Sequence, residues 1–411
     1  MSATFVQVGA TRDGLDPYLD QARRRGMTAV LVETGDYLDW RRRWGRRPFD
    51  REIAVDHPED PVSVVAALRE AGVAPALVLT GFERYVGSGF AVAALLGVAP
   101  WPAARPEFTP PGKAAQRAAL TRSGGRLRQP GHAHRPGGGE FTGLDGLRFP
   151  QVVKPSDGGG GLGVYLVDDE AGRDRAVAAI DALTNYGGGA FAGIVVEEFV
   201  KGVEHSVQGV AIDGRVLVLS TCEKIIAIEP ADVPGLDGFR ELGHICSAGV
   251  VADPALLELA RDCLAATGYR EGPFHIDVMW GADGPEFLEM GFRLSGGGLH
   301  ALVERATGLS WADVVFAAHL GERLPDLGGP GVVAGHLHVR TAGELAAAEE
   351  LGLSVTRFEA PPTVAGEPAP LASDRLRHTA YAGRVVVTGT RPAEVRAQLE
   401  ALLTGDRPCA D

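Results

Sequence analysis

The sequence predicts an α/β region at the N-terminus, a largely antiparallel α+β region in the middle and a small C-terminal subdomain. Over the first hundred residues, short apolar runs alternate with helical segments, as in a parallel sheet covered by helices. In the middle of the chain, neighbouring strand patterns are joined by turns, which indicates an antiparallel sheet. After Leu320, a glycine- and proline-rich stretch opens a last run of strands and helices.

These changes in texture divide the 411 residues into four segments. The second segment is rich in proline, glycine and arginine and carries one helical pattern around Lys113 to Thr121. At His132 to His134 it contains H-A-H, where we expect a solvated loop rather than a metal site, because no acidic or cysteine partner lies nearby. The expected segments are an N-terminal α/β domain (1–100), a linker helix with a small domain (101–190), a large domain (191–320) and a C-terminal α+β subdomain (321–411).

Composition excludes several functional classes. The chain has 40 basic and 53 acidic residues, a net charge of −13, which argues against nucleic acid as a partner. No long uninterrupted apolar run and no leader pattern appears, so we expect a cytoplasmic protein without a membrane partner. The four cysteines show no C-x-x-C spacing, which argues against a disulfide scaffold or a zinc ribbon.

Lysine is unusually rare in this chain. Only four of the 40 basic residues are lysine: Lys113, Lys154, Lys201 and Lys224. A compact ammonium and a planar guanidinium are not interchangeable, so each lysine suggests a site that arginine would not serve.

The stretch V-V-K-P-S-D-G-G-G-G-L-G-V places Lys154 at the end of a strand, just before the glycines at 158–161. In a P-loop the lysine follows the glycines and a helix comes next, whereas this loop returns into another strand. Backbone N–H groups of such a loop can close over phosphates while the lysine supplies a point charge. A merely flexible turn is the alternative.

A second stretch, V-V-E-E-F-V-K-G-V-E-H-S-V, reads as a strand that ends in paired acids. Its backbone could meet a purine edge, with Glu204 on ribose hydroxyls. An edge strand with solvated charges is the alternative, and by itself this stretch favours it.

A third stretch, residues 275–298, reads as a hairpin that leads into a glycine-rich loop. Strict alternation puts Phe287, Glu289, Gly291 and Arg293 on one face of its second strand. If the loop is Ala282 to Gly284, Asp277 lies directly opposite Glu289, and a divalent cation such as Mg²⁺ would turn that repulsion into a pair of oxygen ligands. Another loop length would separate the two acids.

These three elements, in this order, resemble the ATP-grasp superfamily. The resemblance covers most of the chain and implies an ATP-grasp fold with an N-terminal Rossmann-like domain. It also implies ATP and Mg²⁺ as cofactors, with Mn²⁺ as an alternative, and Asp277 and Glu289 as metal ligands. The ATP-binding residues that it implies are Lys113, Lys154, Gly158, Gly159, Gly160, Gly161, Glu197, Glu198, Phe199, Val200 and Glu204.

Within the superfamily, shorter motifs resemble the bacterial L-amino acid ligases, which are dipeptide synthetases. T-C-E-K at 221–224 and R-E-L-G-H with Glu241 and His244 are similar to theirs, as is the C-terminal H-T-A-Y-A-G-R-V-V-V-T-G. The resemblance implies that Arg293 grips an acyl phosphate and that Glu241 and His244 orient the amino acid, although His244 could instead be a satisfied core histidine. Gly291 stands where relatives outside this branch have a ligand asparagine, and we expect its missing side chain to leave room for a neighbouring carboxylate or water.

The implied function is an ATP-dependent ligase that joins an amino acid carboxylate to an amine, in particular that of another amino acid, through an acyl phosphate. Small-molecule carboxylates and amines would be its partners, and a homodimer is compatible with the resemblance. Two alternatives stay open: a ligase for a γ-glutamyl, other side-chain or non-amino-acid carboxylate, and a non-catalytic nucleotide-binding regulatory protein.

Overall fold

The structure is a computed structural model. It describes residues 3–12, 15–98, 110–124, 127–185, 189–247, 254–326, 331–358 and 381–404. Cys409 and the first residues of the C-terminal H-T-A-Y motif lie outside the described residues.

The N-terminal region is a four-stranded parallel sheet in the order β3-β2-β1-β4, as the alternating pattern predicts. Pro61 and the carboxylate of Asp60, which accepts from the amides of Val62 and Ser63, start one of its helices. The elements are β1 (Thr4–Val8), α1 (Pro17–Arg24), β2 (Thr28–Glu33), α2 (Gly35–Arg43), β3 (Arg51–Ala54), α3 (Pro61–Glu70), β4 (Leu77–Thr80), the short 3₁₀ helix η1 (Glu83–Tyr85) and α4 (Val86–Leu96).

The rest of the described chain is built on a 12-stranded sheet whose strand pairs are antiparallel, as predicted. Its main path runs β13-β12-β9-β10-β11-β7-β6-β8-β5. The elements before the sheet's edge hairpin are α5 (Lys113–Arg122), β5 (His132–Pro136), β6 (Gln151–Pro155), β7 (Tyr165–Val167), α6 (Glu170–Ala182), β8 (Gly193–Glu198), β9 (Val203–Ile212), β10 (Arg215–Pro230), β11 (Asp237–Ser247) and α7 (Pro254–Thr267).

The C-terminal strands join this sheet through β11, which pairs with β14, and β16 pairs with both β14 and β15. Thr341 and Glu344 form a reciprocal capping box at the start of α10. The remaining elements are β12 (Gly272–Gly281), β13 (Gly284–Gly291), α8 (Leu299–Thr307), α9 (Trp311–Leu320), β14 (Val333–Val339), α10 (Ala342–Glu350), β15 (Ser354–Arg357), β16 (Gly383–Gly389) and α12 (Pro392–Thr404).

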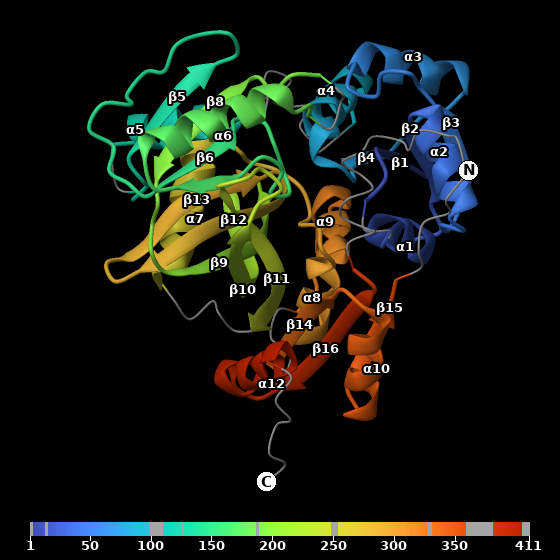
Figure 1. Ribbon diagram of the computed structural model, residues 1–411. Helices are drawn as coiled ribbons and strands as arrows, with labels where there is room; N and C mark the ends of the chain where they lie inside the picture. The colour runs from blue at the N-terminus through green and yellow to red at the C-terminus, as the bar shows by residue number, and fades with distance from the viewer. Residues whose placement is uncertain are drawn as a thin grey trace.

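The ribbon separates into lobes (Figure 1). Three clusters of buried apolar side chains pack their elements together. The largest joins the N-terminal sheet to the strands around β9 and β12, with Phe5 and Phe316 in ring contact across that junction at 5.0 Å. A second lies between β6, β8 and α6, and a third holds β14 and β16 against α10 and α12. Because the first cluster spans both regions, the N-terminal loops are fixed relative to the large sheet.

Helix α5 begins at Lys113, as predicted, and covers the edge strand β13. The amide of Gln116 donates to the carbonyl of Met290 and accepts from its N–H, at 2.8 and 2.9 Å. Arg117 donates to the carbonyls of Phe287 and Leu288, at 2.7 and 2.8 Å. The open hydrogen-bonding groups of an edge strand are thereby satisfied from within the chain.

The hairpin between β12 and β13 has a shorter loop than expected, but Asp277 still lies opposite Glu289. Gly281 pairs with Gly284, so the loop is two residues long rather than three. Leu288 is then an extra residue, and this bulge restores the register in which Asp277 lies opposite Glu289. The bulge also breaks the expected alternation, because Phe287 is buried in the core and does not share a face with Glu289.

The H-A-H stretch is not the expected solvated loop. It forms β5, in which His132 and His134 pair with β8. No described helix is long and apolar enough to cross a membrane.

Candidate active site

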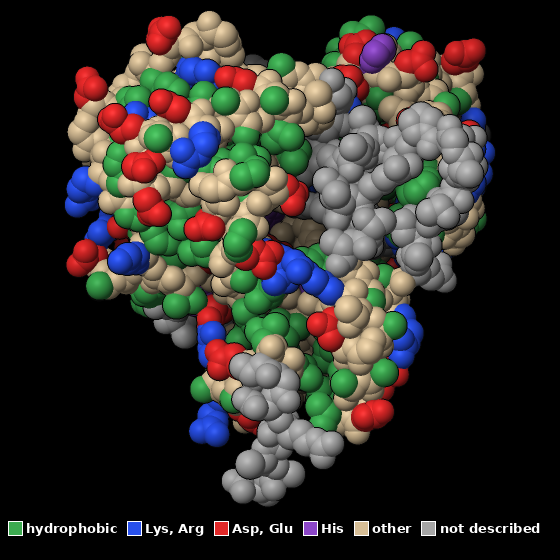
Figure 2. Space-filling view, in the orientation of Figure 1, with side chains coloured by type: hydrophobic (Ala, Val, Ile, Leu, Met, Phe, Trp, Pro, Cys, Tyr) green, Lys and Arg blue, Asp and Glu red, His purple; other side chains and the backbone are tan. Residues whose placement is uncertain are grey.

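A cavity of about 1070 Å³ lies where the lid strands, the large sheet, the N-terminal loops and the C-terminal strands meet. Figure 2 shows this face hollowed near its centre, with acidic and basic side chains interspersed around it. The cavity wall includes the sequence-predicted residues Lys113, Lys154, Gly158, Gly159, Gly160, Gly161, Glu197, Glu198, Phe199, Val200, Glu204, Glu241, Asp277, Glu289 and Arg293. Among the predicted site residues, only His244 is not part of this wall.

The glycine loop between β6 and β7 forms one side of the cavity. Gly160, Gly161 and Gly163 have φ values of 68°, 77° and 69°, which residues other than glycine rarely adopt. The backbone path of the loop therefore requires glycine at these three positions.

Lys154 is anchored by a buried group of charges. Its Nζ lies 2.8 Å from Glu197 Oε2, and Glu197 Oε1 accepts from Arg117 at 2.8 Å. Burial lowers the pKa of Lys154, whereas Arg117 and Lys154 outweigh burial at Glu197 and lower its pKa. Glu197 thus fixes Lys154 at the cavity, and its carboxylate is occupied with that task.

Lys113 connects the acid strand to the glycine loop. Its Nζ lies 3.1 Å from Glu289 Oε2 and donates to the carbonyl of Gly158. The backbone N–H of Lys113 donates to the carbonyl of Ser156 at 2.8 Å. Burial by itself would lower the pKa of Lys113, but the nearby Glu289 outweighs it and raises that pKa. Despite burial, Lys113, Lys154 and Lys224 hold the pKa of Glu289 well below its usual range.

Lys224 is a further candidate site residue, beyond those that the sequence predicts for the site. Its Nζ lies 2.6 Å from Asp277 Oδ2, 2.7 Å from Glu204 Oε1 and 3.9 Å from Glu241 Oε2. These acids outweigh burial and raise the pKa of Lys224, while burial raises the pKa of Glu204. The rarity of lysine was the signal: three of the four lysines meet carboxylates at the cavity.

The two predicted metal ligands fit a divalent cation of the Mg²⁺ type. Asp277 and Glu289 are cross-strand partners, and Asp277 Oδ1 is buried without a hydrogen-bond partner. No group of three or more metal-ligating side chains is arranged around one point among the described residues. Mg²⁺ commonly binds to one or two carboxylates and completes its shell with phosphates and water. Two oxygen donors on one wall suit that mode rather than a cage made of protein alone.

Glu241 and His244 are brought together by a second bulge. Residues three apart on a strand normally face opposite sides. Here Gly243 pairs with Ile225 and Glu241 with Ile226, so Leu242 is extra and both side chains share one face. His244 Nε2 lies 3.7 Å from Glu241 Oε1, but its ring is buried behind Glu241 and burial lowers its pKa. Glu241 therefore meets the cavity, and His244 supports it.

Gly291 does not leave the free space expected from its missing side chain. A Cβ built there would lie 2.1 Å from Cε1 of His275, the residue directly opposite on β12. The imidazole fills the position, and its Nδ1 donates to the carbonyl of Arg293 at 3.2 Å. Gly298 is similar, because a Cβ there would lie 2.1 Å from Nη1 of Arg384 on β16.

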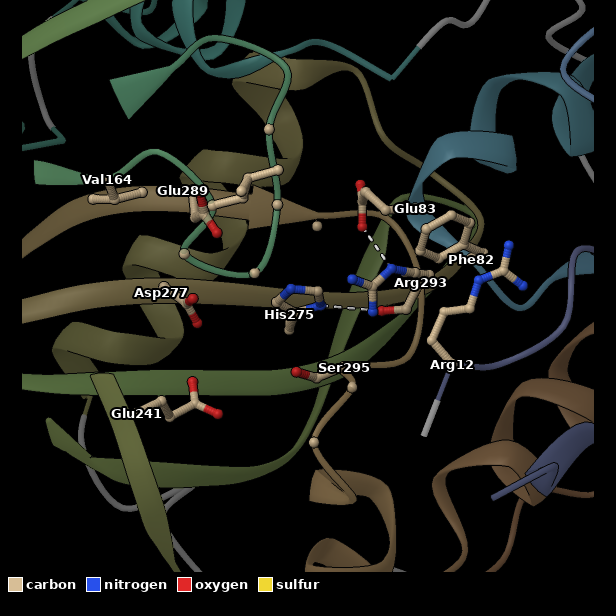
Figure 3. A pocket seen from close by; sticks show the side chains of 18 of the residues that line it. Arg12, Phe82, Glu83, Val164, Glu241, His275, Asp277, Glu289, Arg293 and Ser295 are labelled. Carbon is tan, nitrogen blue, oxygen red and sulfur yellow. Dashed lines mark hydrogen bonds and ion pairs between the residues drawn. The ribbon is translucent and has the colours of Figure 1, made fainter. Parts of the chain in front are cut away.

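Arg293 lies at the junction with the N-terminal domain. Its Nε lies 2.6 Å from Glu83 Oε2 at the start of η1. Figure 3 shows the carboxylates of Glu289, Asp277 and Glu241 along one side of the cavity, with Arg293 and Glu83 beyond His275. Glu83 and Arg384 were not predicted, because no local pattern links them to the acid strand. His275 lies in the predicted hairpin opposite Gly291, but its side chain was given no role there.

The fold and this site define an α/β protein in which a glycine-rich loop borders a cavity wall of paired lysines and carboxylates. Residues 147–300 match the family model described as the ATP-grasp domain. The chain has the ATP-grasp fold, with an ATP-grasp domain at these residues.

Comparison with solved structures supports the same fold over the whole chain. The L-amino acid ligase from Bacillus licheniformis superposes with a TM-score of 0.71, at 20% identity, over 98% of each chain. At this identity the likeness shows a shared fold.

Two curated relatives match part of the chain. Dapdiamide A synthase from Enterobacter agglomerans is 26% identical over 164 residues, which are 39% of this chain and 37% of that protein. Carnosine synthase 1 from Gallus gallus is 30% identical over 194 residues, 44% of this chain and 20% of that protein. The match therefore spans about a third and a fifth of these relatives.

Proposed function

We propose that the protein is a cytoplasmic ATP-dependent ligase that joins the carboxylate of an amino acid to an amine, in particular that of a second amino acid. The carboxylate oxygen attacks the γ-phosphorus of ATP and the bond to ADP breaks. The amine then attacks the carbonyl carbon of the acyl phosphate, phosphate leaves and a proton is released. The products are an amide, ADP and phosphate.

The observation that carries this proposal is the arrangement of charge along one cavity wall. Lys113 and Lys154 lie beside the glycine loop, Asp277 and Glu289 lie opposite each other, and Arg293 follows on the same chain segment. Phosphoryl transfer needs mainly positioning and neutralisation of phosphate charge, and these groups supply both.

Each part of the wall has a role in this reaction. The lysines and the loop amides hold the phosphates, and the irregular segment between β8 and β9, including Phe199 and Val200, borders the nucleotide end. Arg293 faces the acyl phosphate with a fork suited to phosphate oxygens. When bound at Asp277 and Glu289, Mg²⁺, or Mn²⁺ in its place, would neutralise charge on the transferred phosphate.

Glu241 gives this cavity a group for an amino acid. Its carboxylate lines the wall beyond Asp277, where it can pair with the α-ammonium of the amino acid that serves as the amine substrate, before that group loses its proton and attacks. The names of the similar proteins support an amino acid ligase, since they include an L-amino acid ligase, a dapdiamide synthase and a carnosine synthase.

The test is ADP release across a panel of carboxylate and amine pairs, with mass spectrometry of the products. We expect ADP release that needs both substrates and a product whose mass is that of the two substrates together less one water. Linkage through a side-chain carboxyl in the product spectrum would point to a γ-glutamyl type of ligase instead. Nucleotide binding without turnover of any pair would overturn the ligase and favour a regulatory protein.

A further inference from the structure

Three histidines of the C-terminal side of the sheet form a continuous buried group behind Glu241. His244 on β11 lies directly opposite His336 on β14, and His338 follows two residues later on the same face. Neighbouring ring centroids are 5.2 Å and 5.1 Å apart. His244 and His336 are almost fully buried, whereas His338 reaches the cavity wall.

The contact between His244 and His336 requires defined tautomers. His244 Nδ1 lies 3.1 Å from His336 Nε2, so one nitrogen must carry the hydrogen and the other must offer its lone pair. Burial lowers the pKa of both imidazoles, which keeps them neutral near pH 7. A neutral imidazole has one N–H, so the choice at one ring decides the other.

The carboxylate of Glu241 decides that choice. Its Oε1 lies 3.7 Å from His244 Nε2, where an N–H faces a negative oxygen favourably and a lone pair does not. With the hydrogen on Nε2, Nδ1 of His244 must accept, and His336 must donate from its Nε2. Lys224 approaches the other oxygen, Oε2, at 3.9 Å. Each carboxylate oxygen of Glu241 thus has a favourable neighbour, at ion-pair rather than hydrogen-bond distance.

We propose that His336 is a positioning residue for the amine substrate: its Nε2–H holds His244 in the Nε2-protonated tautomer, which keeps the Glu241 carboxylate turned toward the cavity. The C-terminal subdomain would thereby take part in the site through a hydrogen bond. Its role in catalysis rests on the proposed function, whereas the tautomers do not depend on it.

The decisive variants are His336→Gln and His336→Asn, which differ by one methylene. The amide nitrogen of glutamine can replace the Nε2–H donor, whereas that of asparagine lies nearer the Nδ1 position and cannot reach His244. We expect His336→Asn to raise the KM for the amine about tenfold or more and His336→Gln to stay within about twofold of wild type. The KM for ATP should not change in either variant, which also shows that both remain folded.

A spectroscopic readout tests the hydrogen bond directly. In the ¹⁵N-histidine-labelled protein, long-range ¹H–¹⁵N correlations should show His244 and His336 with the hydrogen on Nε2. In His336→Leu, the resonances of His244 should shift.

The outcomes separate two failures. Finding His244 with its hydrogen on Nδ1, or equal amine KM values for His336→Gln and His336→Asn, overturns the proposed chain of hydrogen bonds while the ligase stands. If the wild type releases no ADP with any substrate pair, the proposed ligase function and the substrate role of His336 are both wrong. The tautomers of His244 and His336 then test only the hydrogen bond between them.

Discussion

The imidazole of His275 occupies the space that a side chain at Gly291 would fill. The two residues are cross-strand partners next to the Asp277 and Glu289 pair, so the wall beside the candidate metal ligands is made by a ring from the opposite strand. Gly291 is therefore a close-approach glycine, required by a neighbour rather than by its own backbone.

Any side chain at position 291 should be destabilising. In Gly291→Ala the new Cβ meets the His275 ring at 2.1 Å, and overpacking of this kind costs about 1–3 kcal/mol of the free energy of unfolding. Urea unfolding measures the loss. The double variant Gly291→Ala with His275→Ala should regain most of it, and a single variant as stable as wild type would contradict this packing.

The two acids of the hairpin should be essential for turnover. Glu289→Gln keeps the size of the side chain but removes a charge that faces Lys113, and we expect loss of ADP release that depends on both substrates. Chelation of divalent cations should do the same to wild type. Glu286→Gln, on the same strand and paired with Arg128 outside the cavity, is the matched control and should remain active. Full activity of Glu289→Gln would refute the metal role.

Loss of the Lys154 side chain should weaken ATP binding. Lys154→Ala removes an ammonium at the phosphate side of the cavity, and loss of one charged contact should raise the KM for ATP about tenfold or more. Lys201→Ala serves as the control, because this exposed lysine does not line the cavity. If ATP affinity and turnover survive in Lys154→Ala, the phosphate clamp is wrongly assigned.

The neighbouring acids Glu197 and Glu198 should differ sharply in their importance for stability. Arg117→Met leaves buried Glu197 with one partner and two β13 carbonyls without their donor, which should cost about 3–5 kcal/mol. Arg148→Ala breaks the ion pair of Glu198, whose arginine is 84% exposed, and should cost about 0–1 kcal/mol. Urea unfolding of both variants compares them, and equal costs would contradict the assigned burial.

Acid should destabilise the fold through its buried histidines. Burial lowers the pKa of His319 to about 3, below its unfolded value of about 6.5. The unfolded chain therefore takes up the proton first, so stability is complete above about pH 6.5 and is lost as the pH falls toward 3, by up to about 1.4 kcal/mol per pH unit. His319→Gln should reduce the slope of the free energy of unfolding against pH, between pH 7 and 5, by up to about one proton. An unchanged slope would contradict this role of His319.

Sequence patterns predicted the parts of this protein that depend on neighbours along the chain. The parallel and antiparallel regions, the start of α5 at Lys113 and the facing of Asp277 and Glu289 follow from periodicity and turn signals. The last was right although the loop was one residue shorter than expected, because the bulge at Leu288 compensates.

The parts that could not be predicted arise where distant segments meet. Arg384 reaches Gly298 from β16, and Glu83 of the N-terminal domain pairs with Arg293. Nothing in the local sequence around Gly298 or Arg293 indicates these partners. His275 is different, because the predicted hairpin register already places it opposite Gly291, although the register alone does not show that the ring fills the vacant volume. Likewise, the bulge at Leu242 that aligns Glu241 with His244 is set by pairing with β10.

The scarcity of lysine makes the protein unusually simple to modify chemically. Reagents that acylate amines do not react with arginine under mild conditions, so only four ε-amines are candidates in 411 residues. Lys201 is exposed, whereas Lys113, Lys154 and Lys224 sit at the cavity with side chains 12%, 9% and 9% exposed. Acylation mapped by peptide mass, with and without nucleotide, would therefore report occupancy of the cavity from a nearly silent background, without any engineered label.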